Sequence, residues 1–411
     1  MKYLVTHDNR IIKGKVSLPS SKSISNRLLI LKALSGNIIN VENISESEDS
    51  VIMQKALKTE GKEIDVGHAG TAMRFLTAYC AVTEGERVLT GSSRMKQRPI
   101  GKLEEALRNL GASIRYLGEE SYPPLLIQGQ SLNGGSIEID GNISSQYISA
   151  LLLIAPFLPE GLTIHLRKKV ISVSYIELTL DLLRKSGFAC EFSGNTIHVS
   201  PSLPRKFTIQ VEPDWSSASY WYEAVAFSSE AELFIEGLQP ESKQGDARIH
   251  ELFEEIGVHT EFTGEGALLS KKNARVRKFA YDMIKMPDMI QTFAVTLFVL
   301  YIPFIIHGAE SLRIKETDRI HALQTELAKL GAKIDYDESG VLSWNGRKDR
   351  AQAGIPIFDT YHDHRMALAF APLAMVTNGV MIDDPGVIVK SYPGYWDDLK
   401  NLGFAVKDIP G

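Results

Sequence analysis

The chain has 411 residues, 44% of them hydrophobic and 23% charged, which is enough to bury a substantial core and to form two or three domains. Its formal net charge of −5 argues against a nucleic-acid-binding protein that works by neutralising phosphates. The densest basic run, residues 271–278, lacks interleaved aromatic side chains, so we interpret it as a solvated turn or edge.

The two cysteines and the hydrophobic segments bear on the compartment. Cys80 and Cys190 lie in apolar runs, which predicts two buried thiols in a reducing compartment and neither a disulfide nor a metal pair. The first residues lack the apolar region of a signal peptide. The most hydrophobic stretch, residues 289–306, contains Gln291 and Pro303, which favours a buried helix leading into a strand over a membrane span. We therefore expect a soluble, cytoplasmic protein.

Six segments along the chain share a polar start, an amphipathic helix and a glycine, most of them continuing into an apolar run. They are residues 47–64, 98–114, 174–192, 246–262, 317–334 and 395–409. A glycine after the last helical turn supplies the left-handed conformation that ends a helix. The first two of these glycines, Gly61 and Gly111, are 50 residues apart, and the later ones follow at intervals of 70–76 residues. This period is too long for a solenoid and fits a unit of about two helices and several strands.

A second set of helical segments alternates with the first. They are residues 20–34, 67–82, 141–156, 213–227, 286–300 and 361–375, and each begins with capping residues and then turns almost wholly apolar. An all-round apolar helix is buried, so each unit should have one inner and one amphipathic outer helix. Short strand-like runs such as 134–141, 162–167 and 303–308 lie between the helices. The pattern predicts an α/β fold of six pseudo-repeats rather than one doubly wound sheet.

The starts of the buried helices are candidate anion sites. A helix N-terminus carries free N–H groups and partial positive charge, and several of these starts also carry cations or hydroxyls. Each could be an ordinary cap, but caps do not need Lys and Arg beside them. The residues concerned are Lys22, Ser23, Arg27, Ser144, Ser145, Gln146 and Arg365.

Two further charged segments are candidates. Lys315 and Arg319 are four residues apart and could present two cations on one helix face, with the Glu316 carboxylate beside them. Residues 93–99 contribute Arg98 before a proline that opens a helix. Each of these segments, taken alone, could also be a solvated surface.

Several familiar motifs are missing from the sequence. It contains no GxxxxGK[ST] loop, no GxGxxG turn and no HExxH motif. The run that starts at Asp335 begins like a calcium loop but has Gly346 at its twelfth position, which favours a hairpin turn. We expect no metal and no cofactor.

Eight motifs together resemble the enolpyruvyl transferase family over nearly the whole chain. They are LPSSKSISNR (18–27), AGTAMR (69–74), RMKQRPI (94–100), SSQY (144–147), DWSSASY (214–220), QGDAR (244–248), KETDR (315–319) and DHRMA (363–367). The SSQY and KETDR segments resemble the branch of the family that acts on shikimate 3-phosphate. The sister branch, which acts on UDP-N-acetylglucosamine, typically has a cysteine in the loop corresponding to residues 92–99, where this chain has none. That branch and a non-catalytic phosphate-binding protein on the same fold are the alternatives.

The resemblance implies a two-domain, inside-out α/β barrel with three βαβαββ-type units in each domain. One domain would be continuous over residues 20–212, with residues for shikimate 3-phosphate. The other would combine residues 1–19 with 213–411, with residues for phosphoenolpyruvate. The active site would lie in a cleft that closes and excludes water. The protein would act as a monomer.

The resemblance also implies the reaction and its residues. The enolpyruvyl group of phosphoenolpyruvate would pass to the 5-hydroxyl of shikimate 3-phosphate, with release of phosphate. The base would be Asp288 and the acid Glu316, with Lys22 as a second candidate for the acid. Shikimate 3-phosphate would be held by Lys22, Ser23, Arg27, Ser144, Ser145, Gln146, Ser172, Tyr175, Asp288 and Lys315. Phosphoenolpyruvate would contact Lys22, Gly70, Arg98, Gln146, Arg319, Arg365 and Lys390.

Three positions and one segment carry more specific expectations. Gly70, which has no side chain, should let a ligand approach the backbone closely. His68 and Ser311 stand where the family usually has asparagine. The first repeat is short, so we expect a trimmed strand pair between Gly61 and Gly67.

Overall fold

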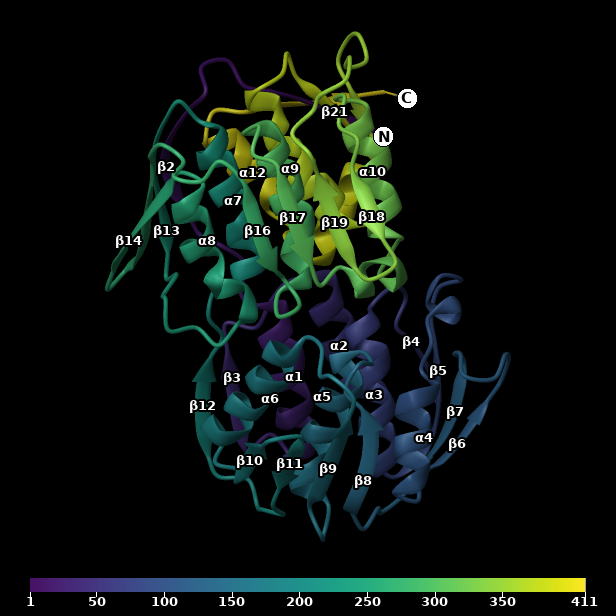
Figure 1. Ribbon diagram of the computed structural model, residues 1–411. Coiled ribbons are helices and arrows are strands. Elements are labelled where there is room, and N and C mark those ends of the chain that lie inside the picture. Colours follow the sequence, from purple (N-terminus) through teal and green to yellow (C-terminus); the bar gives the residue numbers. More distant parts are fainter. Residues whose placement is uncertain (411) are drawn as a thin grey trace. The chain divides into compact units, whose positions relative to one another are not determined.

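The computed structural model describes residues 1–410, which divide into two compact units (Figure 1). Unit 1 contains Met1–Pro19 and the chain from Pro213 onward, and unit 2 contains Ser20–Glu212. The chain therefore passes from one unit to the other twice. In unit 1 the Asp214 N–H donates to Pro19 O at 2.9 Å, and in unit 2 the Ser21 N–H donates to Glu212 O at 2.8 Å.

Unit 1 contains three four-stranded sheets, whose strands follow one another in space in these orders. The first is β14 (Val258–Thr263), β15 (Gly266–Lys271), β13 (Glu230–Glu236) and β2 (Ile11–Val16). The second is β16 (Phe279–Asp282), β17 (Phe304–His307), β19 (Val341–Trp344) and β18 (Asp335–Asp337). The third is β20 (Ile357–Phe358), β21 (Val380–Asp383), β1 (Lys2–Thr6) and β22 (Ala405–Ile409).

Unit 2 contains two four-stranded sheets and one two-stranded sheet. The first is β10 (Cys190–Ser193), β11 (Thr196–Val199), β9 (Leu162–Arg167) and β8 (Gly135–Asp140). The second is β4 (Glu63–Asp65), β5 (Gly85–Thr90), β7 (Leu125–Gly129) and β6 (Ser113–Tyr116). The third is β12 (Phe207–Gln210) and β3 (Ile39–Glu42).

One pairing scheme recurs in every four-stranded sheet. Two parallel strands lie at one edge, and an antiparallel hairpin follows them, as in β8, β9, β11 and β10. In the last repeat the hairpin is made of β22 and β1, so a strand from the start of the chain completes a sheet from its end. The prediction of six α/β repeats, three in each unit, is confirmed.

The first repeat is shorter than expected. Its sheet has only the parallel pair β12 and β3, and the hairpin found in the other repeats is missing altogether. The strand that lies between Gly61 and Gly67 is β4, which opens the next sheet. The predicted trimmed strand pair is therefore wrong: the whole pair is gone, which accounts for the shorter glycine interval.

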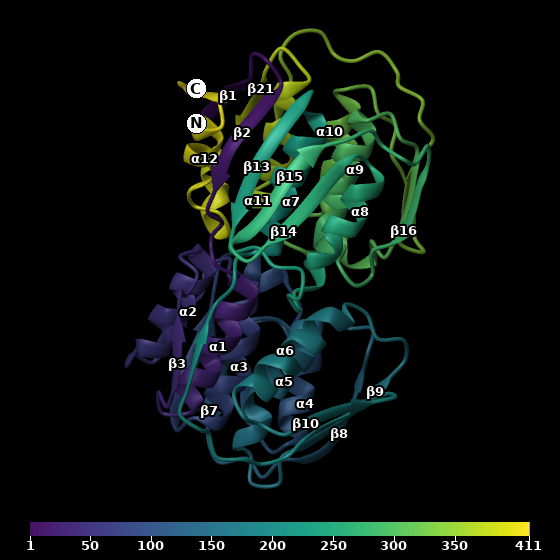
Figure 2. The same cartoon turned by 90° about the vertical axis from the view of Figure 1, so that its left-hand side faces the viewer.

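The two helix classes are confirmed. The inner helices are α1 (Lys22–Leu34), α3 (Gly70–Val82), α5 (Ser145–Ile154), α7 (Trp215–Phe227), α9 (Ile290–Val299) and α11 (His364–Phe370). The outer ones are α2 (Glu48–Lys58), α4 (Gly101–Asn109), α6 (Val173–Lys185), α8 (Ile249–Glu255), α10 (Arg319–Ala328) and α12 (Tyr395–Asn401). In each unit the three inner helices contact one another, and the sheets lie outside them (Figure 2). Each unit is thus an inside-out arrangement of separate sheets around central helices.

The most apolar segment has the structure that its sequence predicts. Residues 290–299 form α9, which is buried, and the chain then enters β17 at Phe304. Within residues 1–410 there is no helix with the length and apolar character that crossing a membrane requires.

The predicted caps are found at only some of the inner helices. The side chains of Ser144, Asp214 and Asp363 accept hydrogen bonds from backbone N–H groups in the first turns of α5, α7 and α11. Helix α3 follows Ala69, which cannot cap, and α9 is entered through a 3-10 turn at Pro287–Met289. The packing of apolar faces, rather than capping, is what the six inner helices have in common.

A buried carboxyl lies between two inner helices of unit 1. Glu223 of α7 is fully buried, and its Oε1 accepts a hydrogen bond from Thr296 Oγ1 of α9 at 3.2 Å, while its Oε2 is buried without a partner. Burial raises the pKa of Glu223 well above its ordinary value, against the weaker opposing effect of the Thr296 hydrogen bond. Burial therefore favours the protonated form of Glu223 in the folded protein.

Glu223→Gln should make unit 1 more stable than wild type at neutral and alkaline pH. Above a pH of about 4.5 the unfolded chain gains by ionising Glu223 and the folded chain does not, so wild type loses up to ~1.4 kcal/mol per pH unit until the raised pKa is reached. The glutamine variant lacks this loss. Urea unfolding followed by tryptophan fluorescence reports unit 1 alone, because Trp215, Trp221, Trp344 and Trp396 all lie there.

The matched control is Glu265→Gln, on an exposed turn between β14 and β15. It should show no growing advantage with pH. An equal response of both variants between about pH 5 and 8 would contradict the assignment of a neutral Glu223.

Candidate functional site

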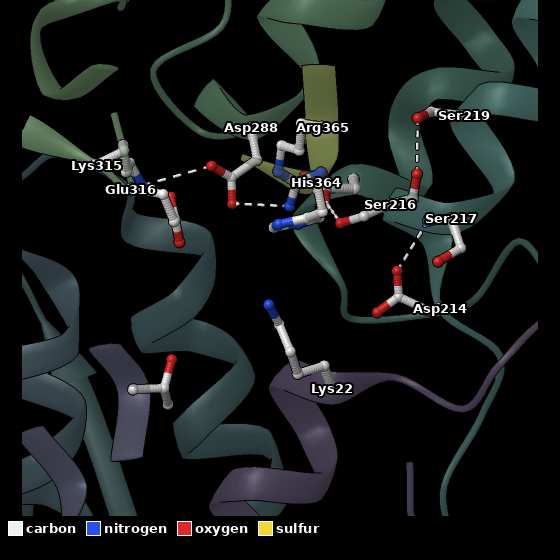
Figure 3. A network of polar contacts seen from close by, with 12 residues as sticks. Lys22, Asp214, Ser216, Ser217, Ser219, Asp288, Lys315, Glu316, His364 and Arg365 are labelled. Carbon is white, nitrogen blue, oxygen red and sulfur yellow. Dashed lines mark hydrogen bonds and ion pairs between the residues drawn. The ribbon is translucent and has the colours of Figure 1, made fainter. Parts of the chain in front are cut away.

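In unit 1 the candidate site is centred on Asp288. This residue lies on the 3-10 turn that leads into α9. Its Oδ1 lies 2.8 Å from Arg319 Nη1. Figure 3 shows its two other contacts, from Oδ1 to Lys315 Nζ at 3.4 Å and from Oδ2 to Arg365 Nη2 at 3.2 Å. One carboxylate is thus contacted by three cations, two from the KETDR segment and one from the start of α11.

Arg319 joins this carboxylate to two others. Its Nε donates to Asp363 Oδ2 at 2.7 Å, and its Nη2 donates to Glu316 Oε2 at 2.9 Å. The side chain is almost completely buried. Burial by itself lowers the pKa of Arg319, but Asp363, Glu316 and Asp288 together raise it above its usual range. Arg319 is therefore a permanent cation that orients three acidic side chains.

The predicted helical face of the KETDR segment is wrong. Helix α10 begins at Arg319, with Asp318 as its N-cap accepting from the His321 N–H at 3.1 Å, so Lys315 lies in the preceding loop. The four-residue spacing therefore does not place the side chains of Lys315 and Arg319 on one helix face. Lys315 and Arg319 nevertheless reach the same oxygen of Asp288, because the loop turns back before the helix starts.

Two more of the predicted residues, Arg365 and Lys390, lie on and near α11. Asp363 Oδ1 caps the helix by accepting from the Arg365 N–H at 2.9 Å, and Arg365 Nη1 donates to Tyr220 Oη at 3.2 Å. Lys390, which ends a 3-10 turn, is buried and donates from Nζ to His362 O at 2.7 Å. The cap residue therefore fixes both the helix that carries Arg365 and the guanidinium of Arg319.

In unit 2 the candidate residues lie at the starts of inner helices. Lys22, the first residue of α1, lies 3.4 Å from Asp49 Oδ2. Gln146 of α5 donates to Thr71 Oγ1 of α3 at 3.2 Å, and the Ser144 side chain caps α5. Neighbouring helix starts are thus linked by polar side chains.

Arg27 is a buried cation held by neutral groups. Its guanidinium donates to Thr179 Oγ1 at 2.7 Å and to Ser149 Oγ at 3.1 Å, and it lies over the rings of Phe75 and Tyr175 at 5.3 and 5.9 Å. Burial lowers the pKa of Arg27 to about 10, so it stays charged at neutral pH. No carboxylate in residues 1–410 pairs with it within 4.0 Å. A buried cation without a carboxylate favours the binding of an anion nearby.

Arg98 and Gly70 form a second cationic feature. Arg98 is buried, and its Nε has no hydrogen-bond partner within the described chain. A Cβ added to Gly70 would lie 2.5 Å from Arg98 Nη1 and 2.9 Å from its Cζ. The space beside Gly70 is therefore filled by the Arg98 guanidinium, whereas the sequence suggested a bound ligand in that place.

The remaining predicted residues of unit 2 have more ordinary settings. Ser172 precedes α6 in a left-handed conformation with φ 50°, and Ser145 is buried in the first turn of α5. Ser23 contributes its backbone oxygen, which accepts from Arg27 Nη1 at 2.8 Å. His68 is exposed, with Nδ1 3.0 Å from Ser92 Oγ.

Several buried polar residues of these sites did not stand out in the sequence. The sequence did indicate a role for Asp363, because this residue is a typical helix cap that precedes an apolar helix within DHRMA. Asp49 and Thr179 lie on helices away from the motifs, Ser149 lies on α5 just after the SSQY motif, and only the fold brings them to Lys22 and Arg27. Among residues 1–410 no group of three or more His, Cys, Asp or Glu side chains is arranged to hold a metal ion.

Comparison of the sequence with known proteins gives full-length matches. The sequence pattern of the family described as EPSP synthase (3-phosphoshikimate 1-carboxyvinyltransferase) matches residues 54–399. A 3-phosphoshikimate 1-carboxyvinyltransferase from Bacteroides fragilis is 47% identical over 409 residues, covering 99% of this chain and 99% of that protein. One from Aliivibrio salmonicida is 36% identical and covers 95% of this chain and 97% of that protein.

Comparison of the structure gives the same fold. An EPSP synthase from Acinetobacter baumannii superposes with a TM-score of 0.75 at 22% identity, covering 99% of this chain and 100% of that chain. An enolpyruvyl transferase from Streptomyces tendae gives a TM-score of 0.74 at 16% identity, covering 100% and 99%. At such identities the structural similarity establishes the fold and no more.

Arg319→Met should destabilise unit 1 by ~3–5 kcal/mol, because it leaves the buried Asp363 carboxylate without its cation. Methionine keeps most of the aliphatic volume, so the loss reports charge and hydrogen bonds rather than a cavity. The measurement is urea unfolding followed by tryptophan fluorescence.

Arg313→Met is the control for Arg319→Met. Arg313 is half-exposed and pairs with Glu338 at 2.8 Å and Asp318 at 3.4 Å on the surface. Its replacement should leave the unfolding transition nearly unchanged. If the two variants lost similar free energies of unfolding, Arg319 would not be central to the stability of unit 1.

Proposed function

Because this chain belongs to the EPSP synthase family and so transfers the enolpyruvyl group of phosphoenolpyruvate to the 5-hydroxyl of shikimate 3-phosphate, we propose that Asp288, Glu316 and Lys22 carry its proton transfers. The reaction releases phosphate and belongs to the shikimate pathway, which leads to chorismate and the aromatic amino acids. The sister reaction with UDP-N-acetylglucosamine is not favoured by these relatives.

Asp288 is the proposed base for the 5-hydroxyl. The observation that carries this proposal is the contact of its carboxylate with Lys315, Arg319 and Arg365. A base must be ionised and correctly oriented before it can take a proton. The three cations favour the ionised form and fix both oxygens. They also weaken the base, and the negative charge that the substrates bring would offset that effect.

Glu316 and Lys22 are the proposed acids for the methylene carbon of phosphoenolpyruvate. Arg319 donates to Glu316, which favours the ionised form, whereas a proton donor must be protonated. We infer that a substrate anion must take over this Arg319 donor before Glu316 can hold a proton. Lys22 needs no such change, because an ammonium group already carries its proton.

The substrates are small polyanions, and the proposed contacts match their charge. We propose that Arg27 and Arg98 attract anions, because both are buried cations with no carboxylate partner among the described residues. The other proposed contacts for shikimate 3-phosphate are Lys22, Ser23, Ser144, Ser145, Gln146, Ser172, Tyr175, Asp288 and Lys315. Those for phosphoenolpyruvate are Lys22, Gly70, Gln146, Arg319, Arg365 and Lys390.

We further propose that the protein works as a cytoplasmic monomer without metal or cofactor. All six repeats and all the proposed residues come from one chain. Sedimentation at working concentration would test the monomer, and an unchanged rate after treatment with a chelator would test the absence of a metal.

Phosphate release from phosphoenolpyruvate should require shikimate 3-phosphate and should not occur with UDP-N-acetylglucosamine. Asp288→Asn keeps the shape and loses the base, so kcat should fall by roughly 10²–10⁴-fold while shikimate 3-phosphate still binds. Glu316→Gln should also lower kcat with little change in KM. The measurement is steady-state phosphate release with each acceptor.

Three results would contradict this assignment in different ways. Release with the sugar nucleotide alone would move the chain to the sister branch. Binding of shikimate 3-phosphate without any release would favour the phosphate-binding alternative. Normal turnover of Asp288→Asn would remove Asp288 as the base.

Gly70→Ala should raise the KM for phosphoenolpyruvate about tenfold or more, since its Cβ would displace the Arg98 guanidinium. Binding of shikimate 3-phosphate in the absence of phosphoenolpyruvate should change little. In an Arg98→Ala background the same substitution should have almost no further effect, because the displaced group is already gone.

Gly118→Ala is the control in the same unit, as its Cβ would meet only Pro124 at an ordinary 3.6 Å. Additive effects of Gly70→Ala and Arg98→Ala would mean that the two residues act separately.

A further inference from the structure

One buried carboxyl beside the unit 1 site has no part in the mechanism above. Asp246 lies on the 3-10 turn Gly245–Arg248, just before α8, and is 5% exposed. Its Oδ2 accepts a hydrogen bond from Ser216 Oγ in the first turn of α7. Its Oδ1 is buried and has no hydrogen-bond partner among residues 1–410. An ionised carboxylate in such a place would normally receive donors on both oxygens.

The charged groups that face Asp246 come from three other segments. They are Asp288 on the turn before α9, Asp214 at the start of α7 and Arg365 on α11, all labelled with Ser216 in Figure 3. On its own turn, Arg248 is exposed and pairs with Glu251 at 3.2 Å. Asp246 forms no ion pair within 4.0 Å in the described chain. The charges that act on Asp246 are therefore those of two acidic groups and one cation.

The ion pairs of the neighbouring cluster include three carboxylates, those of Asp288, Glu316 and Asp363, with Lys315, Arg319 and Arg365. An ionised Asp246 would add a further negative charge beside them. A protonated Asp246 would not, and its hydroxyl would still accept the bond from Ser216.

Electrostatics support a proton on Asp246. Burial, and after it the charge of Asp288, raise the pKa of Asp246 from 3.8 to about 6, while Arg365 and Ser216 act in the opposite direction. Its protonation therefore changes within the range in which a cytoplasmic enzyme works. Two anionic substrates would raise this pKa further, because they add negative charge to the same site.

We propose that Asp246 is a positioning residue that takes up a proton when the anionic substrates bind, and so keeps the cluster around Asp288 and Arg365 from gaining a second negative charge. This inference rests on the proposed site of the reaction. It makes substrate affinity depend on pH through a group that does not touch the substrate. As pH rises past the value at which free Asp246 loses its proton, binding must restore that proton, and the affinity falls.

The decisive experiment is titration calorimetry of shikimate 3-phosphate binding at about pH 7.5, in buffers of different ionisation enthalpy. Wild type should take up more protons per bound ligand than Asp246→Asn, by up to one proton. The ligand phosphate titrates in the same range, but it does so equally in both proteins and cancels in the difference. Affinity should also fall more steeply with pH in wild type than in Asp246→Asn.

Two further variants separate this role from a merely structural one. Ser216→Ala removes a hydrogen bond that stabilises the ionised form, so the pH at which proton uptake appears should rise. Asp288→Asn removes the repelling charge, so that pH should fall. Both remain informative if Asp246→Asn does not fold.

Equal proton uptake and equal pH dependence in wild type and Asp246→Asn would overturn the proposal. So would a Ser216→Ala variant with an unshifted pH profile. Because these measurements follow binding, they stay separate from the reaction itself: absence of turnover in wild type would contradict the proposed function without altering the proton count.

Discussion

The geometry of the unit 1 site depends on one guanidinium group, that of Arg319. Its planar, permanently charged fork contacts carboxylates from the turn before α9, from the loop before α10 and from the cap of α11. A lysine could meet only part of this requirement, because its ammonium is a point charge without a fork. Because Arg319 is buried, solvent competes little for these bonds. Segments far apart in the sequence are thereby held in one arrangement, and the proposed roles of Asp288 and Asp246 both presuppose it.

Both units bury cations, but with different partners. In unit 1, Lys315, Arg319 and Arg365 pair with the Asp288 carboxylate, whereas Lys390 donates to a backbone oxygen. In unit 2, Arg27 is held by hydroxyls, a backbone oxygen and aromatic rings, and Arg98 lies against Gly70. Buried cations held by neutral groups therefore occur in both units, although the whole chain carries a net charge of −5. Local arrangement, and not overall charge, is what suits this protein to polyanionic substrates.

Hydrophobic periodicity was sufficient to predict the repeats and the two classes of helix, because a buried helix must be apolar all round. It could not predict that the first repeat lacks a hairpin entirely. A short interval between glycines shows that residues are missing, but not which strands are lost. The spacing of Lys315 and Arg319 misled for a definite reason: the rule holds within a helix, and the helix starts at Arg319. The contact between Gly70 and the Arg98 guanidinium and the burial of the Asp246 carboxyl could not be predicted, because neither depends on local sequence. Both arise from contacts between segments that only the fold brings together.

The exchange of strands between distant repeats has a consequence for the order of folding during synthesis. Unit 2 is continuous in the sequence, so all of its strands exist once the ribosome has passed β12. Strand β2 can pair only after β13 has been synthesised. Strand β1 can pair only after β21 and β22 have been synthesised. Until then β1 and β2 are unpaired strands of an incompletely synthesised chain, and they can pair with other chains. The last sheet of unit 1 can therefore form only after β22 has been synthesised, which makes it a late step in folding.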